Sequence, residues 1–177
     1  SGLGNEALSV SNTSTISELN DLDTETTGVI TANVNSGNAS TMSGLTNVNS
    51  NNAYSYTLTD TSIAASTLNI LDAATAGTIT VSATTITGSA ADINTAYASS
   101  GFSGLGDEAV TIDDTSIAAS VLNTLNSNTT GLVTATSVAT LTGTAAAINT
   151  LVGNEGDSGD KVNLDSCLLY TSDAADD

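Results

Sequence analysis

Carboxylates are the side chains of this 177-residue chain best suited to chemistry, because it carries 19 Asp and Glu, one Lys or Arg, and no His. Asp113 and Asp114 follow a strand-like stretch, and Asp157 and Asp160 lie in a Gly-rich loop. Oxygen ligands suit Ca²⁺, so these four residues are candidates for a calcium site. Neither stretch has the spacing of an EF-hand or of a glycine-rich calcium-binding nonapeptide. The alternative interpretation is that the acids are solvated charges that keep the chain soluble.

The composition excludes most other site chemistry. With no His and one Cys, zinc, haem, iron–sulfur and histidine-based catalytic sites lack their usual ligands. No His or nearby Lys is available to activate a Ser or Asp as a nucleophile, so we expect no catalytic residues and no cofactor other than the calcium candidate. A carboxylate pair that hydrolyses glycosides is the catalytic arrangement left open, although repeats rarely contain a unique pair.

Charge and hydropathy exclude two classes of partner. The formal net charge is -18, and the single cation, Lys161, cannot neutralise the phosphates of a nucleic acid. We therefore expect no binding to nucleic acid or to anionic membranes. No apolar run approaches about 18 residues, the length that indicates a transmembrane helix, so we also expect no membrane insertion.

Internal repetition is the strongest signal in the sequence. The segment 60–66 returns unchanged at 114–120, and the segment 1–7 returns at 103–109 with Asp in place of Asn. Units of about 52 residues contain two related halves of about 26 residues, the length of one solenoid coil. An apolar residue followed by Asn marks each half. These marker asparagines are Asn20, Asn49, Asn69, Asn94, Asn123 and Asn149.

The marker asparagines have two interpretations. In the first, each side chain hydrogen-bonds backbone groups within or between coils. In the second, they form a row of exposed amides that binds sugar or ice. We prefer the first, because each Asn directly follows a core position in a helical pattern, where Asn is a poor choice on propensity alone.

Short helices and short strands are expected to alternate. Apolar residues three or four apart around the marker asparagines predict helices of about 8–11 residues. The β-branched stretches 78–87 and 132–142 predict strands. The first stretch loses its alternation near Ser82, which indicates two short strands joined by a turn.

Helix ends also have sequence signals. Thr15 with Glu18 fits a capping box, and Ser89 with Asp92 fits a looser version. Glycines that follow the helical patterns are expected to be the C′ residues that end the helices. They are Gly28, Gly77, Gly101, Gly131 and Gly153.

These patterns predict an α/β repeat solenoid of about six coils, each of about 26 residues with one short helix and one or two short strands. Two strands per helix match the packing distances of both elements, which favours a straight rod over a curved solenoid. Each layer has few large apolar residues, so coils need neighbours to fold. The predicted half-units lie near residues 1–28, 29–54, 55–77, 78–102, 103–131 and 132–153, and another begins at 154–166.

Threonine pairs two residues apart raise a surface function. A flat array of such pairs orders water in ice-binding solenoids, whereas the alternative is that Thr is simply the polar residue of these strands. We prefer the alternative, because the pairs do not recur at one fixed coil position. The pairs are Thr13/Thr15, Thr57/Thr59, Thr78/Thr80, Thr85/Thr87, Thr134/Thr136 and Thr140/Thr142.

The last eleven residues differ from the rest. Residues 167–177 resemble the translation of a sequencing-library adapter, and we expect them to be a non-native tail. The alternative is a genuine tail of weak order. The only Cys, Cys167, lies in this segment, so it supports no redox inference.

Three runs of the sequence resemble a known class of repeats: residues 86–97, 103–110 and 116–125. They look like the tandem repeats of giant, acidic cell-surface proteins of marine cyanobacteria and other aquatic bacteria, of the adhesin and swimming-motility type, often linked to calcium-binding RTX modules. The resemblance covers about residues 1–166 and implies an extracellular or cell-surface location. It brings no catalytic residues, and the chain has no RTX nonapeptide.

Three functions follow in order of preference. The first is a structural repeat segment of a large secreted or cell-surface protein, as a stalk, adhesin or fibre, whose partners are further repeats of the same chain. The second is a repeat module that binds glycan or ice, with glycans or neighbouring copies as partners. The third is a polysaccharide-degrading enzyme, and we expect the chain not to be an enzyme.

Overall fold

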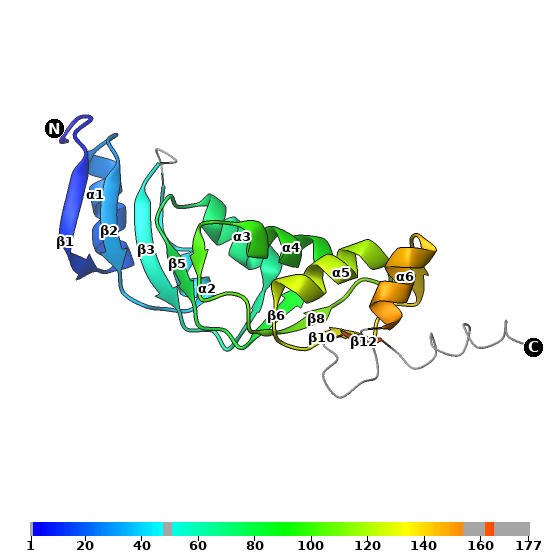
Figure 1. The fold of residues 1–177 in the computed structure, drawn as a ribbon. Coiled ribbons are helices and arrows are strands. Elements are labelled where there is room, and N and C mark those ends of the chain that lie inside the picture. The colour runs from blue at the N-terminus through cyan, green and yellow to red at the C-terminus, as the bar shows by residue number, and fades with distance from the viewer. Residues whose placement is uncertain (1, 48–50, 154–161, 165–177) are drawn as a thin grey trace, which may run out of the picture. The chain divides into compact units, whose positions relative to one another are not determined.

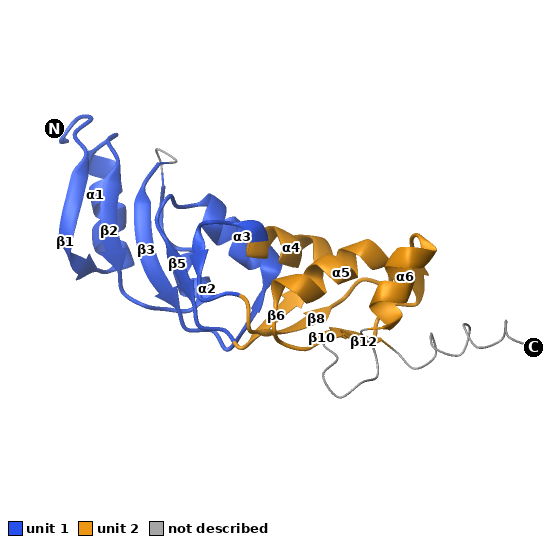
Figure 2. Ribbon diagram, viewed as in Figure 1, with its two compact units in different colours: residues 1–83, 98–105 blue, residues 84–97, 106–177 orange. Residues whose placement is uncertain are grey.

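Short helices and short strands alternate along the chain in the computed structural model (Figure 1). The structure describes residues 2–47, 51–153 and 162–164. Asn49, Asp157 and Asp160 lie outside these ranges, as does the expected tail at 167–177. The chain divides into unit 1 (residues 1–83 and 98–105) and unit 2 (residues 84–97 and 106–177), which we treat separately (Figure 2).

The prediction of an α/β fold is confirmed, and the paired strands run parallel. The helices of the described residues are α1 (Ile16–Glu25), α2 (Ala39–Met42), α3 (Ala65–Ala73), α4 (Ala90–Ala98), α5 (Ala119–Asn128) and α6 (Ala145–Val152). The strands are β1 (Leu8–Ser14), β2 (Ile30–Val34), β3 (Ala53–Leu58), β4 (Ser62–Ala64), β5 (Ile79–Val81), β6 (Thr85–Gly88), β7 (Phe102–Ser103), β8 (Ala109–Ile112), β9 (Ser116–Ala118), β10 (Val133–Ala135), β11 (Thr140–Thr142) and β12 (Val162–Leu164).

In unit 1, five parallel strands join in the order β1-β2-β3-β5-β7. The connection between each strand and the next includes a helix, as parallel pairing requires. Alternate residues of β2 and β3 are buried, so one face of the sheet is apolar and the other polar. The helix α1 lies against β1 and β2 (Figure 1).

In unit 2, β6, β8, β10 and β12 pair in that order, and β9 pairs with β11. The stretch 132–142 contains two strands, β10 and β11, and the stretch 78–87 contains β5 and the beginning of β6. Two strands in the latter stretch are therefore confirmed, and the turn between them falls at residues 82–84, near Ser82.

The apolar residues that precede the marker asparagines are part of a core that also includes buried strand residues such as Ile30, Ile79 and Ile112. Four of the residues that precede the markers have no exposed surface, and each contributes ~1.5–3 kcal/mol by its burial. They are Leu19, Leu68, Ile93 and Leu122. The fifth described one, Ile148 in α6, is only half-buried. In the half-unit 29–54 the helix is α2, which ends at Met42, before its marker.

Both predicted helix caps are present. The Thr15 hydroxyl accepts from the Glu18 N–H, and the Glu18 carboxylate accepts from the Thr15 N–H at 2.8 Å, which completes the capping box. Ser89 Oγ accepts from the Asp92 N–H at 3.1 Å and donates to the Asp92 carboxylate at 2.8 Å.

The prediction that the glycines after the helical patterns are the C′ residues of the helices is wrong: Gly153 is the C-cap of α6, and Gly28, Gly77 and Gly131 lie beyond the C′ positions of their helices. The glycines with positive φ are Gly4, Gly88, Gly104, Gly106 and Gly143, none of which was in that set. Gly153 follows α6 with a right-handed helical φ of -67°. Three of the predicted set have a different physical reason to be glycine, which is a close approach between two backbones.

This close approach occurs in a turn that we call the Thr-x-Gly turn. Its Thr hydroxyl accepts from the Gly N–H and donates to a carbonyl about one coil earlier. A Cβ on the glycine would collide with the backbone of the residue that supplies this carbonyl. The turns are Thr26–Gly28, Thr75–Gly77 and Thr129–Gly131, and the carbonyls are those of Glu6, Tyr54 and Glu108 respectively.

None of the helices in the described ranges combines the length and the apolar character that a membrane crossing requires.

Candidate functional site

Three of the marker asparagines, Asn20, Asn94 and Asn123, hydrogen-bond to the half-unit that follows. Asn20 Nδ2 donates to the Gly44 carbonyl at 2.9 Å, and Asn20 Oδ1 accepts from the Thr46 N–H at 2.9 Å. Asn123 Nδ2 donates to the carbonyl of Ala147, which lies in α6, at 3.0 Å. These bonds support the structural interpretation, because each connects residues about one coil apart.

The other described markers lie on the same helical positions. Asn94 Nδ2 contacts the Val121 carbonyl of α5 at 3.4 Å, and Asn94 Oδ1 accepts from Asn128 Nδ2 at 2.9 Å. Asn69 is half-buried in α3, and Asn149 is exposed on α6. The interpretation as exposed sugar- or ice-binding amides therefore fits only Asn149.

Sequence reasoning missed Asn47 and Asn52. Asn47 Nδ2 donates to the Ala74 carbonyl at 2.6 Å, a coil-to-coil bond like that of the markers. The spacing of Asn47 from Asn20 and Asn69 could have indicated this role. The pattern of an apolar residue followed by Asn selects Asn49 instead, because it directly follows an apolar residue, Val48.

A recurring aspartate caps a helix of the preceding coil. Asp60 Oδ2 accepts from the Ala39 N–H at 2.8 Å in unit 1, and Asp114 Oδ2 accepts from the Ala90 N–H at 2.7 Å in unit 2. Both N–H groups belong to the first residue of a helix, where backbone donors lack intrahelical partners. The identical segments 60–66 and 114–120 thus begin with a cap that acts between coils.

This role bears on the calcium candidates. One oxygen of Asp114 is used by the helix cap, and Asp113 is exposed. No group of three or more Asp, Glu, Cys or His that could hold a metal occurs among the described residues. Asp157 and Asp160 lie outside the description, so the calcium site remains a prediction.

Unit 1 contains a buried polar network. Asn52 has no exposed surface; its Nδ2 donates to Asp23 Oδ1 at 2.7 Å and contacts the Tyr54 hydroxyl at 2.9 Å. Its Oδ1 accepts from the Ile30 N–H at 2.8 Å. Burial, together with the charge of Asp23, raises the pKa of Tyr54 to about 12. This network connects two successive half-units, because Asp23 belongs to α1 while Asn52 bonds to the first residue of β2 and to Tyr54 of β3.

Unit 2 contains a simpler buried pair. Glu108 is 1% exposed, and its Oε2 accepts from the Tyr97 hydroxyl at 3.0 Å and from the Gly106 N–H at 2.9 Å. Glu108 Oε1 is buried without a hydrogen-bond partner among the described atoms. Burial is the main cause that raises the pKa of Tyr97, and the neighbouring Glu108 carboxylate acts in the same direction.

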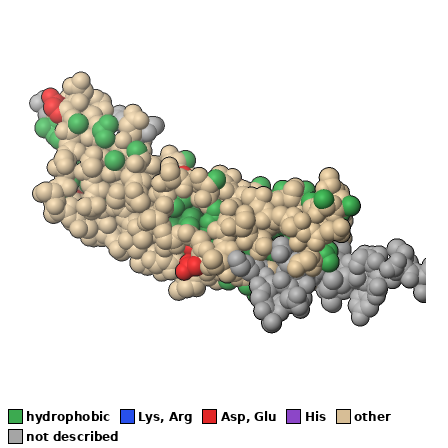
Figure 3. Space-filling model, in the orientation of Figure 1, with side chains coloured by type: hydrophobic (Ala, Val, Ile, Leu, Met, Phe, Trp, Pro, Cys, Tyr) green, Lys and Arg blue, Asp and Glu red, His purple; other side chains and the backbone are tan. Residues whose placement is uncertain are grey.

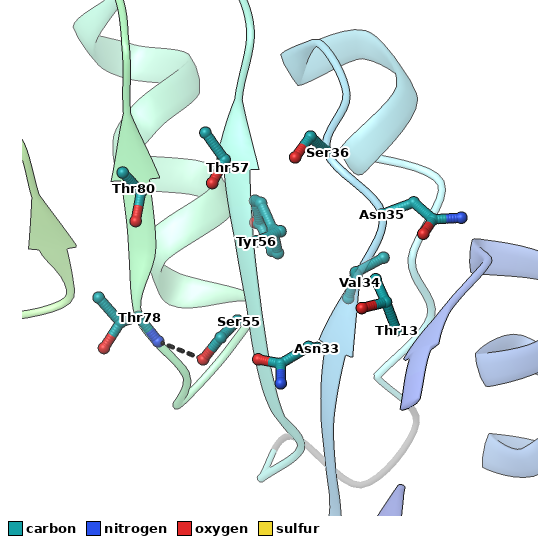
Figure 4. A pocket seen from close by; sticks show the side chains of 10 residues that line it. All are labelled: Thr13, Asn33, Val34, Asn35, Ser36, Ser55, Tyr56, Thr57, Thr78 and Thr80. Carbon is teal, nitrogen blue, oxygen red and sulfur yellow. Dashed lines mark hydrogen bonds between the residues drawn. The ribbon is translucent and has the colours of Figure 1, made fainter. Parts of the chain in front are cut away.

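The outward face of the unit 1 sheet is a neutral polar surface. Figure 4 shows Asn33, Ser55 and Thr80 projecting from three neighbouring strands around a shallow hollow of about 440 Å³. Thr57 lies opposite Thr80 in the register, and the Thr80 hydroxyl is 3.0 Å from that of the next strand's Ser103. The visible face of the molecule is mostly uncharged polar side chains and backbone, with few carboxylates (Figure 3).

Single threonines align across neighbouring strands, whereas the Thr-x-Thr pairs do not, since Thr57 of the pair 57/59 lies opposite Thr80 of the pair 78/80. In unit 2, Thr87 lies opposite Thr111, and Thr111 lies opposite Thr134.

Comparison with known protein families, with curated proteins and with solved structures finds no match for the chain.

Proposed function

We propose that the chain is a solenoid of stacked coils of about 26 residues, and that it serves as a structural repeat segment of a large extracellular or cell-surface protein, as a stalk, adhesin or fibre. The observation that carries the proposal is the Thr-x-Gly turn, whose Thr hydroxyl donates in the same way to a backbone carbonyl 20 or 21 residues earlier, close to one coil length, at residues 26–28, 75–77 and 129–131.

The polar groups of the chain are used mainly to join coils. Neighbouring coils are joined by the side chains of Asn20, Asn94 and Asn123, by the Asp60 and Asp114 caps, and by the buried carboxylates of Asp23 and Glu108. A protein organised in this way can be lengthened by adding units without changing the contacts of existing ones. Such extensibility suits a spacer more than a single active site.

A repeat-number series tests the proposal. A second copy of residues 55–108, inserted after residue 108, should raise the free energy of unfolding by about 3 kcal/mol or more, at the ~0.05–0.15 kcal/mol per residue typical of folded domains. A flexible Gly/Ser insert of equal length is the matched control. Unfolding by denaturant measures the difference, and equal stability of the duplicated and control chains would show the stacking proposal to be wrong.

A second function, binding of glycan or ice, is favoured by the outward face of unit 1. Its hydroxyl and amide groups stand on strands about 4.8 Å apart and carry no charge, so they suit a neutral ligand rich in hydroxyl groups or an ordered water layer.

Glycan-array binding and thermal hysteresis test this second function. The substitution Thr80→Lys should abolish either signal, because it places a long charged side chain in the hollow. Ser17→Lys, on an exposed position of α1, is the control and should leave the signal unchanged. Absence of both signals in the unaltered chain would dismiss the function.

A further inference from the structure

The segments 1–7 and 103–109 share both sequence and local structure. In each, the carbonyl of the second Gly of Ser-Gly-Leu-Gly accepts from the N–H of the middle residue of a Thr-x-Gly turn at 2.7 Å. In each, the Glu carbonyl accepts from the Thr hydroxyl of that turn, at 2.6 Å for Glu6 and 2.8 Å for Glu108. Both copies therefore contact the coil that follows them in the same way.

The two copies differ on the side that faces the preceding coil. In unit 2, β6 pairs with β8 from Thr85 opposite Ala109 to Gly88 opposite Ile112. The Ala109 N–H donates to the Thr84 carbonyl at 3.0 Å. This contact and the Tyr97–Glu108 bond cover the segment, so that Glu108 is 1% exposed and Ile112 also 1%.

The same positions in unit 1 are open. Glu6 is exposed, and Leu8 and Val10, which correspond to the buried Val110 and Ile112, are half-exposed. In the described residues β1 is the edge strand of its sheet. The Leu8 N–H donates to the Val29 carbonyl, on the side of β1 that faces β2. Because successive N–H groups of a strand point to opposite sides, the Ala7 N–H faces the free edge.

We propose that this free edge, formed by Glu6, Ala7, Leu8 and Val10, is a docking surface for a coil of the type formed by residues 84–102. The incoming strand pairs with β1 in parallel, with its residue equivalent to Ile86 opposite Leu8. Its helix places a tyrosine hydroxyl, equivalent to that of Tyr97, on the Glu6 carboxylate. The inference rests on the proposed stacking of coils and deepens it by naming the partner coil and its register.

The choice of partner comes from an interface already present in the molecule. The segment that receives the coil in unit 2, residues 103–109, recurs at residues 1–7 with one substitution, Asn5 for Asp107. The apolar positions that follow it are apolar in both copies. Docking removes water from the Glu6 carboxylate, and a tyrosine hydroxyl would replace that water as a hydrogen-bond donor. A coil without the tyrosine would leave the buried carboxylate without this donor. The segment 141–152, which has Val152 where the other copy has Tyr97, is therefore the poorer partner.

The experiment adds a copy of residues 78–102 in front of residue 1 of the full chain, which reproduces the Phe102–Ser103 junction as Phe–Ser1. Amide hydrogen exchange is measured by NMR. The N–H groups of Ala7 and Ser11, equivalent to the bonded N–H groups of Ala109 and Asp113, should exchange at least about tenfold more slowly than in a chain with a scrambled extension.

Two variants separate specific docking from simple extension. Tyr97→Phe in the appended copy, or Glu6→Gln, should reduce this protection at least threefold or so, whereas Glu25→Gln at an exposed position should not. Unchanged exchange at Ala7 and Ser11 would overturn the proposed surface, as would protection that is insensitive to both variants. If the internal duplication of residues 55–108 still raises stability, stacking stands and only the docking surface is wrong.

Discussion

The two units bury a carboxylate beside a tyrosine in different ways. In unit 1, Asn52 stands between Asp23 and Tyr54 and bonds to both. In unit 2, Tyr97 bonds directly to Glu108, one of whose oxygens has no partner among the described atoms. The amide in unit 1 also bonds to the backbone of β2, so the network joins three elements, α1, β2 and β3, where the pair joins α4 to the residue before β8.

The difference teaches how a thin core tolerates buried charge. A buried carboxylate needs donors to replace lost water, and in a chain with one Lys or Arg these donors must be amides, hydroxyls and backbone N–H groups. Neutral donors of this kind hydrogen-bond to the buried carboxylates in place of the cations of a salt bridge. We therefore expect the amide network to contribute more stability than the direct pair.

The largest expected effect is that of Asn52→Leu. It removes three buried hydrogen bonds at once, one of them to the Asp23 carboxylate, and should cost about 3 kcal/mol or more of unfolding free energy. Asn33→Leu, at an exposed position of β2, should stay within about 0.5 kcal/mol. Chemical denaturation of both variants measures this, and a similar cost for both would remove the special role of the network.

The next effect tests the turn that holds Glu108. In Gly131→Ala the new Cβ would collide with the Glu108 backbone, so the variant should lose about 2–3 kcal/mol. Gly153→Ala, at a right-handed helical position after α6, should be close to neutral. Thermal or chemical unfolding compares the two, and a neutral result for both would mean that the coils do not pass as closely as the structure shows.

A direct comparison of the tyrosines comes third. Tyr97→Phe removes a hydroxyl donor to a buried carboxylate and should cost about 1.5–3 kcal/mol. Tyr54→Phe removes a contact with a neutral amide and should cost about 0.5–1.5 kcal/mol. The reverse order, measured by denaturant unfolding, would contradict the distinction between the direct pair and the mediated network.

The last effect appears only at alkaline pH. Burial raises the pKa of Tyr54 from 10.0 to about 12, so the folded state favours the protonated phenol. The resulting stability is fully present below pH 10 and is lost as pH rises from 10 to about 12. Unfolding free energies across this interval should fall less in Tyr54→Phe than in the unaltered chain, and identical slopes would argue against the raised pKa.

Local order was predictable from sequence because it depends on neighbouring residues. The Thr15–Glu18 capping box, the buried residues before the marker asparagines and the break near Ser82 all follow from short-range patterns. The role of Gly131 was not predictable in the same way, because its constraint is the backbone of Glu108, which comes from the preceding coil.

Register was also beyond the sequence. Thr111 and Thr134 lie opposite each other because β8 pairs with β10 in this register, and residue spacing alone does not determine a register. Likewise, Asp114 has the residue type of a metal ligand, but its distance to the Ala90 N–H depends on how β8 is placed beside β6.

In the part of the chain that the structure describes, side-chain bonds between half-units join residues 11 to 34 positions apart, from Tyr97 with Glu108 to Asn128 with Asn94. Each such loop is short, so its closure costs little entropy. A coil can therefore complete its contacts as soon as the following two dozen or so residues have left a ribosome or a secretion channel. A protein of this design could become very long without its folding ever having to wait for a distant part of the polypeptide.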